Sequence, residues 1–173
     1  MNKNADFNIL NLRTGIGYDT HKIKNGRPLM LCGVKIPCDF GLDGHSDADV
    51  MIHALMDALL GAAGLFDIGY YFPNTDNNFK NISSMKLLEK VKGLLADNNF
   101  KIINVDMVLI SEKPKISPHV VNMKLNIASA LQIDSGAVGI KATTNEKLGH
   151  LGRCEGMAAY ASALIYRCAA NKK

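Results

Sequence analysis

An aspartate and a histidine lie one residue apart near the start of the chain, in the segment Asp19-Thr20-His21. Alternate residues of a strand point to the same face, so this carboxylate and this imidazole can bind one ion together. Zinc accepts oxygen and nitrogen ligands of this kind, usually in a tetrahedron. By itself the pair is a weak signal, because the same residues also suit a surface turn.

A second group of ionisable residues lies on a predicted helix that begins at Ser46. Asp49, His53 and Asp57 are four residues apart, so they stack on one face of a helix whose other residues are almost all apolar. Burying such groups is costly unless they are paired or bound to an ion. His53 alone would more often be a core residue, but the flanking carboxylates favour a metal ligand. Together with the strand pair it would leave one tetrahedral position open, as in catalytic zinc sites.

His45 and Ser46 stand immediately before this predicted helix. Helix N-termini attract phosphate through free backbone N–H groups and through the helix dipole. We therefore expect His45 to hydrogen-bond a phosphoryl oxygen, and an exposed loop histidine is the alternative.

A polar loop from Lys141 to Arg153 follows a predicted strand and combines hydroxyl groups, an amide, a carboxylate and basic side chains. Hydroxyl and backbone N–H groups bind phosphate oxygens. A lone glutamate such as Glu146 suits Mg²⁺, which proteins hold with one or two carboxylates plus substrate phosphates. The loop thus predicts a phosphate site, and a polar connection without ligands is the alternative.

The elements that must position these residues follow from periodicity and turn residues. Strands are predicted at 15–18 and 28–34, with a turn at 24–28 between them. Ser46 is the predicted N-cap of the first helix, with Asp49 completing a capping box. Further elements are a helix from Ser84 to Asp97, a strand at 102–110, a helix from Pro118 to Leu131 and a strand at 137–142. Residues 155–167 suit either a helix or a strand, and the order of elements predicts an α+β fold with helices on one face of a sheet.

Length and composition limit the class of protein. A chain of 173 residues suits one domain, and we expect a flexible N-terminal extension at 1–13 and a domain at 14–170. No apolar run approaches the roughly 20 residues that span a bilayer, and no signal peptide is visible. No C-x-x-C pair is present, which predicts reduced, mostly buried thiols in a cytoplasmic protein for Cys32, Cys38, Cys154 and Cys168.

The charge distribution is uneven although the net charge is only +4. No lysine or arginine occurs between Lys35 and Lys80, a stretch that is rich in aspartate. A local excess of carboxylates repels anions and attracts cations, so an anionic substrate must meet this part of the chain through a metal. The acidic stretch and the lack of a basic recognition helix also disfavour nucleic-acid binding.

Four stretches occur in this order in the chain: GIGYDTH, GVKIPCDFGLDGHSDADVMIHALMDALLGAAGLFDIGYYFPNTD, SEKPKISPH and KATTNEKLGHLGRCEG. From about Thr14 to Arg167 the chain closely resembles the 2-C-methyl-D-erythritol 2,4-cyclodiphosphate synthase family of the non-mevalonate isoprenoid pathway. The stretches together are highly specific. The resemblance implies that residues 155–167 form a strand, and that the compact α+β domain forms a homotrimer with its sheets lining the threefold axis and active sites between subunits.

The resemblance also implies the metals and the reaction. Zinc would be bound by Asp19, His21 and His53, and a second divalent ion, usually magnesium, by Glu146 and the substrate diphosphate. The implied substrate is 4-diphosphocytidyl-2-C-methyl-D-erythritol 2-phosphate. Its 2-phosphate attacks the diphosphate phosphorus next to the sugar alcohol, CMP leaves, and an eight-membered cyclic diphosphate remains. No protein nucleophile is required, since catalysis rests on alignment and charge neutralisation.

Further site residues are implied by position. The transition state would be stabilised by His45 and Thr144. Contacts to the methylerythritol part would come from His45, Ser46, Asp67, Ile68, Gly69, Phe72, Pro73, Asn74, Thr75 and Asp76. The cytidine pocket would be formed, largely through backbone groups, by Ser111, Glu112, Lys113, Pro114, Lys115, Ile116, Ser117, Thr143, Thr144, Asn145 and Glu146. Arg153 would reach phosphate, and the substrate would also lie next to Asp19, His21 and His150.

Three residues depart from the pattern of the family. Members often have an acid where Asn74 stands and an aromatic residue where His150 stands, which changes a polar contact and the pocket edge. Many have a glutamate in the axial cavity where Tyr160 falls, which puts isoprenoid-diphosphate binding there in doubt. None of these departures removes a metal ligand.

Two other functions fit part of the sequence. A zinc phosphodiesterase would use bound water as the nucleophile, with Asp57 or Asp49 as the general base. A metal-dependent nucleotide sensor would bind the same ligands without turnover. The reaction products distinguish these readings from cyclisation.

Overall fold

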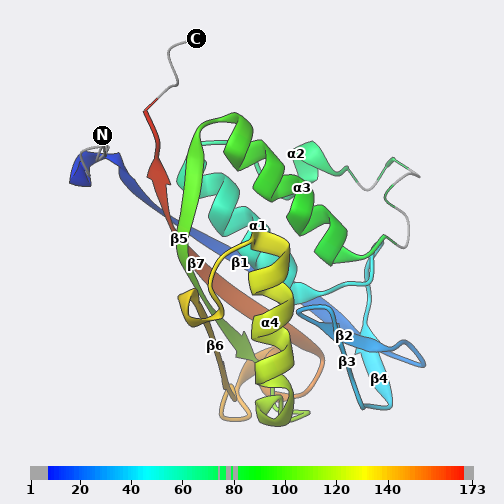
Figure 1. The fold of residues 1–173 in the computed structure, drawn as a ribbon. Coiled ribbons are helices and arrows are strands. Elements are labelled where there is room, and N and C mark those ends of the chain that lie inside the picture. The colour runs from blue at the N-terminus through cyan, green and yellow to red at the C-terminus, as the bar shows by residue number, and fades with distance from the viewer. Residues whose placement is uncertain (1–7, 74, 77–78, 80–81, 170–173) are drawn as a thin grey trace.

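The computed structural model describes residues 8–73, 75–76, 79 and 82–169. A mixed five-stranded sheet with the order β4-β1-β7-β5-β6 forms one layer, and helices cover one of its faces (Figure 1). β5 and β6 are parallel, and the other neighbouring strands are antiparallel. The strands of this sheet are β1 (Leu12–Asn25), β4 (Phe40–Leu42), β5 (Phe100–Ile110), β6 (Val138–Thr143) and β7 (Gly156–Arg167). A separate hairpin joins β2 (Leu29–Leu31) to β3 (Val34–Ile36).

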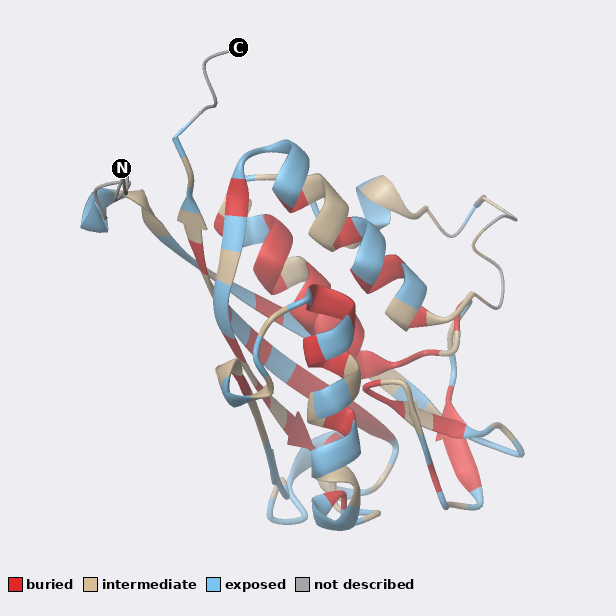
Figure 2. Cartoon of the chain, in the orientation of Figure 1, coloured by how far each residue is buried: buried red, intermediate tan, exposed pale blue. Residues whose placement is uncertain are grey.

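Three helices form the second layer. The central helix α1 (Val50–Ala63) packs on β1 and β7, and most of its residues are buried (Figure 2). α3 (Ser84–Asp97) packs on α1, and α4 (Val120–Leu131) packs on β6 and α3. The short elements are α2 (Ile68–Tyr71), α5 (Gly149–Gly152) and the 3-10 turns η1 (Ile9–Asn11), η3 (Ser117–His119) and η4 (Ser135–Ala137).

Two glycines bring β1 close to α1. A Cβ atom added at Gly15 would lie 2.0 Å from the carbonyl oxygen of Ala58, and one added at Gly17 would lie 1.9 Å from that of Ala54. Only a residue without a side chain fits at such distances. Since residues two apart share a face of a strand, this contact also aims Asp19, the next inward residue, at the start of α1.

The opposite face of the sheet carries exposed large apolar side chains. Ile16 is 73% exposed, and Tyr18 and Tyr160 are each 46% exposed, with their ring centroids 4.7 Å apart across β1 and β7. Within the described residues no helix packs on this face (Figure 1). A contiguous group of such residues on a sheet is typical of a protein–protein interface.

Several predicted elements are confirmed. The helix from Ser84 to Asp97 has the predicted bounds, and strands are found where 102–110 and 137–142 were predicted. Residues 155–167 are a strand, as the resemblance implied. The α+β class with helices on one face of the sheet is also confirmed.

Other predictions are wrong. Residues 28–34 are not one strand, because Cys32 and Gly33 adopt left-handed φ values of 49° and 70° and turn the chain into the β2–β3 hairpin. The first helix begins at Val50, not at Ser46, and its N-cap is Asp49. The strand predicted at 15–18 is longer, because β1 runs from Leu12 to Asn25.

Two remaining expectations concern cysteines and membranes. All four cysteines are free thiols, but only Cys32 is buried, so the prediction of mostly buried thiols is wrong. Burial raises the pKa of the Cys32 thiol well above its ordinary value. None of the helices in the described part of the chain has the length and apolar character needed to cross a bilayer.

Candidate metal and substrate site

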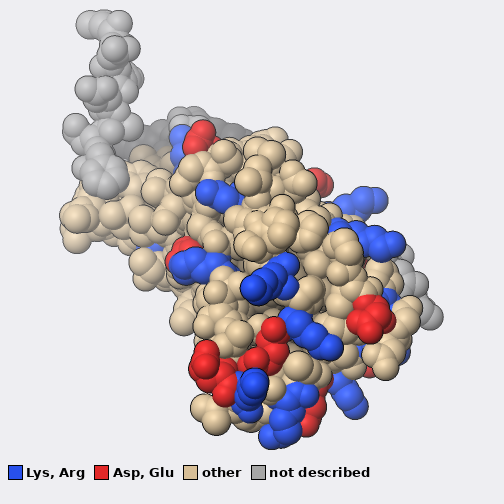
Figure 3. Space-filling view, turned by 90° about the horizontal axis from the view of Figure 1, so that it is seen from below, with Lys and Arg blue, Asp and Glu red and all other residues tan. Residues whose placement is uncertain are grey.

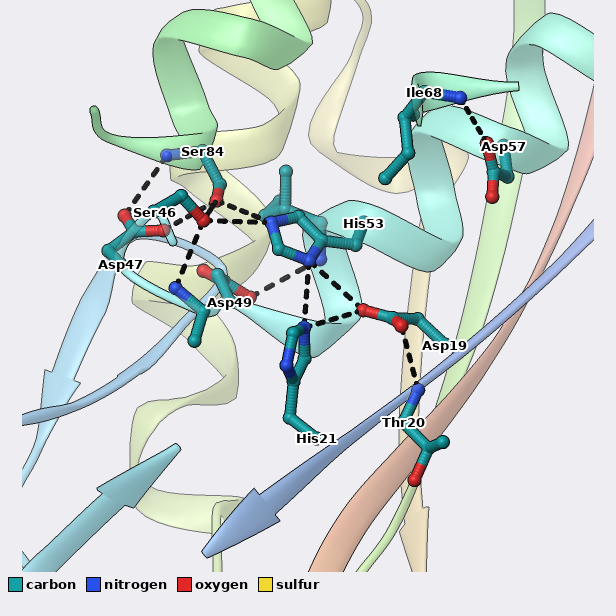
Figure 4. Close-up of polar contacts among 12 residues, drawn as sticks. Asp19, Thr20, His21, Ser46, Asp47, Asp49, His53, Asp57, Ile68 and Ser84 are labelled. Carbon is teal, nitrogen blue, oxygen red and sulfur yellow. Dashed lines mark hydrogen bonds and ion pairs between the residues drawn. The ribbon is translucent and has the colours of Figure 1, made fainter. Parts of the chain in front are cut away.

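Asp19, His21 and His53 meet between β1 and α1. Asp19 Oδ2 lies 2.9 Å from His21 Nε2 and 3.0 Å from His53 Nδ1, and the two histidine nitrogens are 3.0 Å apart (Figure 4). Among the described residues this is the one group of three or more His, Cys, Asp or Glu side chains able to hold a metal. A tetrahedral zinc ion with bonds of about 2.0 Å separates its ligand atoms by about 3.3 Å. The triad therefore needs only a small expansion to accept zinc.

The second polar atom of each ligand has its own partner. Asp19 Oδ1 accepts a hydrogen bond from the backbone N–H of Thr20 at 2.8 Å. His21 Nδ1 lies 2.7 Å from the carbonyl oxygen of Asp43, and His53 Nε2 lies 3.0 Å from Ser84 Oγ and 3.1 Å from Ser46 Oγ. Such outer partners orient metal-binding histidines and fix which nitrogen carries the proton. The donor set and its surroundings thus fit a zinc ion.

The electrostatics of the triad also favour a cation. Burial alone would raise the pKa of Asp19, but hydrogen bonds from His21 and His53 outweigh it and hold the pKa below its ordinary value. Burial alone would lower the pKa of His21, but the carboxylate of Asp19 raises it. Asp19 is therefore ionised and stabilises positive charge on its neighbours, whether that charge is a proton or a metal ion.

The other two aspartates of the predicted stack do not join the triad. Asp49 is fully buried, and its carboxylate accepts hydrogen bonds from Gly33 N at 2.8 Å and from Ile52 N at 3.2 Å. Burial raises the pKa of Asp49 to about 6. Asp57 accepts a hydrogen bond from Ile68 N at 2.9 Å (Figure 4). Both carboxylates accept hydrogen bonds from backbone N–H groups, so the two aspartates that favoured His53 as a metal ligand do not themselves reach the triad.

A cavity of about 280 Å³ opens beside the triad. Its lining includes several residues predicted to contact the methylerythritol part, namely His45, Ser46, Ile68, Gly69 and Phe72. Asp67 instead caps α2 by accepting a hydrogen bond from Tyr70 N at 3.0 Å. Among the described residues the lining does not include Pro73, Thr75 or Asp76, and Asn74 lies outside the described residues.

His45 and Ser46 reach this cavity for a different reason than predicted. They do not stand at the N-terminus of α1, whose N-cap is Asp49 with its side chain accepting from Ile52 N. Instead, the guanidinium group of Arg27 donates hydrogen bonds to the carbonyl oxygens of Gly44 at 2.8 Å and Ser46 at 2.7 Å, which holds the loop that carries His45. No sequence pattern pointed to Arg27, because its partners are 17 and 19 residues away.

A second cavity of about 370 Å³ lies at the ends of β5 and β6. Its lining brings together much of the predicted cytidine pocket: Ser111, Glu112, Pro114, Lys115, Ile116, Ser117, Thr143 and Thr144. Lys113 points elsewhere, with Nζ 5.5 Å from the ring centroid of Phe40. None of these residues lines the cavity beside the triad, so the two cavities are separate within one chain.

The loop after β6 is held by a carboxylate. Glu112 Oε1 accepts hydrogen bonds from the backbone N–H groups of Asn145 at 2.9 Å and Lys147 at 3.1 Å. Thr144 Oγ1 donates to Glu146 Oε1 at 2.6 Å, and Glu146 adopts a left-handed φ of 51°. The structure thus gives Glu112 a positioning contact that sequence reasoning had not assigned, and leaves the second carboxylate oxygen of Glu146 available to a cation.

The last two predicted site residues lie apart from the triad cavity. His150 lines a third cavity of about 440 Å³ together with Thr20 and His21. Arg153 is exposed and forms an ion pair with Glu155, with Nε 2.7 Å from Oε1. Within one chain neither residue lines the 280 Å³ cavity.

Residues 12–166 match the model of the YgbB family. The chain belongs to the YgbB family. It is 57% identical over 154 residues to 2-C-methyl-D-erythritol 2,4-cyclodiphosphate synthase from Dehalococcoides mccartyi, which covers 89% of this chain and 98% of that protein. The resemblance found in the sequence is therefore confirmed at the level of the family.

Solved structures of the family share the fold. Bifunctional IspDF from Campylobacter jejuni matches with a TM-score of 0.88 at 44% identity, over 91% of this chain and 42% of that one. IspF from Plasmodium falciparum in complex with CDP matches with a TM-score of 0.80 at 36% identity, over 91% of this chain and 97% of that one. The sheet and helices that carry the triad are thus those of a synthase family.

Proposed function

We propose that this chain converts 4-diphosphocytidyl-2-C-methyl-D-erythritol 2-phosphate to 2-C-methyl-D-erythritol 2,4-cyclodiphosphate and CMP, as a metal-dependent phosphorus–oxygen lyase of isoprenoid precursor biosynthesis. The observation that carries the proposal is the position of the Asp19–His21–His53 triad on the wall of a cavity that His45, Ser46 and Gly69 also line. The relatives named for this activity support it, because they match nearly the whole chain.

Two metal ions would take part in one cyclisation. Asp19, His21 and His53 would hold zinc, and Glu146 would hold magnesium together with the substrate diphosphate. Bound there, the ions supply Lewis-acid polarisation and charge neutralisation at the phosphate oxygens. In the reaction a new P–O bond forms between the 2-phosphate and the diphosphate phosphorus next to the sugar alcohol, and the bond to the CMP oxygen breaks.

The chain's own side chains would bind and orient the substrate. His45 and Ser46 present an imidazole and a hydroxyl group to the cavity beside the triad, where the apolar side chains of Met56, Phe72 and Leu87 limit access of water. In the second cavity, Ser111 to Ser117 and the Thr143–Glu146 loop would hold the cytidine part, and Thr144 and His45 would stabilise the transition state. Asp67 and the 73–76 segment would complete the sugar contacts, and Arg153 and His150 would act at the phosphate and at the pocket edge.

The proposed assembly is a homotrimer with active sites between subunits. The two cavities are separate within one chain, so a substrate that needs both is best bound where a neighbour brings its second cavity to the triad. The exposed face with Ile16, Tyr18 and Tyr160 offers the apolar surface that such an assembly buries. In this arrangement the sheets line the axis.

We place the reaction in the cytoplasm, with a small-molecule partner and with neither nucleic acid nor a membrane. Basic and acidic side chains lie next to one another over the face seen in Figure 3, so positive and negative charges alternate there. Nucleic-acid binding instead favours a surface of one sign.

A hydrolytic function fits the site less well. A zinc phosphodiesterase needs a general base within reach of a bound water, and Asp49 and Asp57 were the candidates. Both accept hydrogen bonds from backbone N–H groups, and neither lines the cavity beside the triad. A nucleotide sensor would bind the same ligands as the synthase, so only its lack of turnover would distinguish the two.

The deciding experiment is product analysis. The purified protein is incubated with the cytidine conjugate, zinc and magnesium, and phosphorus NMR follows the products. We expect the cyclic diphosphate and CMP in equal amounts, and loss of both signals after treatment with a chelator. A linear hydrolysis product would support the phosphodiesterase, and unchanged substrate would support the sensor.

A further inference from the structure

A line of hydrogen bonds leads away from the metal triad into the protein. His53 Nε2, the nitrogen that faces away from Asp19, lies 3.0 Å from Ser84 Oγ. Ser84 Oγ donates to Asp47 Oδ1 at 2.5 Å, and Ser84 N donates to Asp47 Oδ2 at 3.0 Å (Figure 4). Asp47 thus reaches the ring of His53 through one hydroxyl group.

The direction of these bonds follows from counting protons. An ionised carboxylate only accepts hydrogen bonds, so the single proton of the Ser84 hydroxyl group points to Asp47. The oxygen of Ser84 then faces His53 Nε2 as an acceptor, which requires the ring proton on Nε2. With that proton on Nε2, the lone pair of His53 Nδ1 is available to an ion bound between Asp19 and His21, in place of the contact that Nδ1 makes with Asp19 Oδ2 without the ion.

The partners of His53 are fixed by their positions in the fold. Ser84 is the first residue of α3 and is fully buried, so bulk water does not compete for its hydroxyl group. Ser83, the N-cap residue of α3, makes no side-chain cap bond, and the carboxylate of Asp47 serves the first N–H group of the helix instead. Ser46 Oγ also lies 3.1 Å from His53 Nε2; it accepts a hydrogen bond from Ala48 N at 3.2 Å, and its own proton can point to Ser84 Oγ at 3.4 Å, which leaves both serine oxygens facing Nε2 as acceptors.

We propose that Asp47 and Ser84 are positioning residues of the metal site, which hold the His53 ring in the tautomer and orientation that bind the ion. This inference rests on the proposed zinc site. It differs from the case of His21, whose Nδ1 faces a backbone carbonyl oxygen that no substitution removes. For His53 the outer partner is a side chain, so its contribution can be measured.

The test compares two neighbouring serines at the same end of α3. Zinc dissociation constants are measured by competition with a chromophoric chelator for the wild-type, Ser84→Ala and Ser83→Ala proteins. We expect Ser84→Ala to weaken zinc binding by about 10- to 100-fold, the usual effect of losing an outer-shell partner. Ser83→Ala should bind zinc as the wild type does, because the Ser83 side chain makes no cap bond to α3. Cobalt substitution should show an altered visible spectrum only in Ser84→Ala.

A second variant separates positioning from packing. Asp47→Asn keeps the size of the side chain but supplies an N–H₂ group, which can donate to Ser84 Oγ and turn the serine proton toward His53. We expect it to weaken zinc binding as well, although its metal-free form melts within a few degrees of the wild type.

The outcomes are distinct. If Ser84→Ala and Asp47→Asn bind zinc as tightly as Ser83→Ala does, with only the melting temperature of the metal-free protein lowered, the pair is merely structural and the inference is wrong. If the wild-type protein itself fails to bind one zinc ion per chain, the proposed metal site is wrong and the inference is overturned with it.

Discussion

At the scale of single residues, the site combines groups that attract one another before any ion arrives. The Asp19 carboxylate lies within 3.0 Å of both histidine nitrogens, and each histidine has its second nitrogen next to an oxygen. Such a site is preorganised, so metal binding requires little rearrangement. When one of the three side chains is replaced, each of the other two loses one of its polar partners.

Replacing His53 tests the triad directly. His53→Ala removes one of the three proposed protein ligands, and we expect zinc to fall from about one ion per chain to near zero. Turnover should fall by more than the roughly 100-fold that loss of an outer-shell partner causes. Elemental analysis measures the metal, with His119→Ala as the control because His119 lines none of the three cavities described above. Full zinc content together with normal turnover in His53→Ala would contradict the assignment.

Replacing Glu146 tests the second ion. The Glu146→Gln protein should keep its zinc, because the triad is untouched, but should lose most of its turnover at low magnesium concentration, since the diphosphate charge is no longer offset. Glu89→Gln, on the exposed side of α3, is the matched control. Normal turnover of Glu146→Gln at low magnesium would rule out the two-ion arrangement.

The buried Asp49 predicts a pH dependence of stability. Burial raises its pKa from 3.8 to about 6, so the native state keeps a proton that the unfolded state has lost between these pH values. The contribution of Asp49 to the free energy of unfolding is therefore largest below about pH 4 and is lost as pH rises through 6, by about 3 kcal/mol in all.

The measurement is urea unfolding of wild type and Asp49→Asn from pH 4.5 to 7, with equal metal content in both. The amide side chain of the variant does not titrate, so the free energy of unfolding of the wild type minus that of the variant should fall as pH rises. A difference that stays flat or rises over this range would show that Asp49 has no raised pKa.

At the scale of elements, sequence reasoning succeeded where the pattern is local. α3 has its predicted bounds because its apolar residues repeat with a helical period and its other face is polar. The triad was also predictable, since Asp19 and His21 share a strand face and His53 stands on an apolar helix.

Sequence reasoning failed where the local structure depends on residues that lie elsewhere in the chain. The helix start was placed at Ser46, but its hydroxyl group faces His53, and Asp49 caps the helix. The hairpin at 29–36 depends on a left-handed φ at Cys32, and a cysteine in the sequence does not predict a left-handed φ. Ser84 and Asp47 are 31 and 6 residues from His53, and no local period links them.

The contact between β1 and α1 predicts the effect of one methyl group. In Gly17→Ala the new Cβ atom would meet the Ala54 carbonyl oxygen, so β1 must move away from α1 and carry Asp19 with it. We expect the free energy of unfolding to fall by about 3 kcal/mol, the upper end of the usual cost of an added methyl group, and zinc binding to weaken. The matched control is Gly61→Ala in α1, where a Cβ atom meets nothing within 4 Å.

Calorimetry and chelator competition measure the two effects. Gly61→Ala should be stabilised by up to about 1 kcal/mol, because alanine is the better helix former. If Gly17→Ala is as stable as Gly61→Ala, the close approach of β1 to α1 does not hold the site together.

At the scale of the whole molecule, the residues of the proposed site line two separate cavities, and the sheet has an apolar face that no described element covers. Both features are explained together if copies of the chain assemble through the sheets. The triad of one subunit would then meet the Thr143–Arg153 loop of its neighbour. Sequence periodicity cannot show such an arrangement, because the residues concerned are not in contact within one chain.

Complementation between two inactive variants tests this shared site. His53→Ala damages the zinc half of a site, and Arg153→Ala damages the loop half, where the exposed guanidinium group now pairs only with Glu155 among its described contacts. In trimers reassembled from an equal mixture, about one site in four combines an intact zinc half with an intact loop half from its neighbour. We expect about a quarter of the wild-type turnover from the mixture and almost none from either variant alone.

A mixture of His53→Ala with Asp19→Ala is the control, because every site then has a damaged zinc half and no turnover should return. Light scattering must first show that each variant is a folded trimer. If folded mixed trimers of His53→Ala and Arg153→Ala recover no turnover, both halves belong to one subunit and the shared site is wrong.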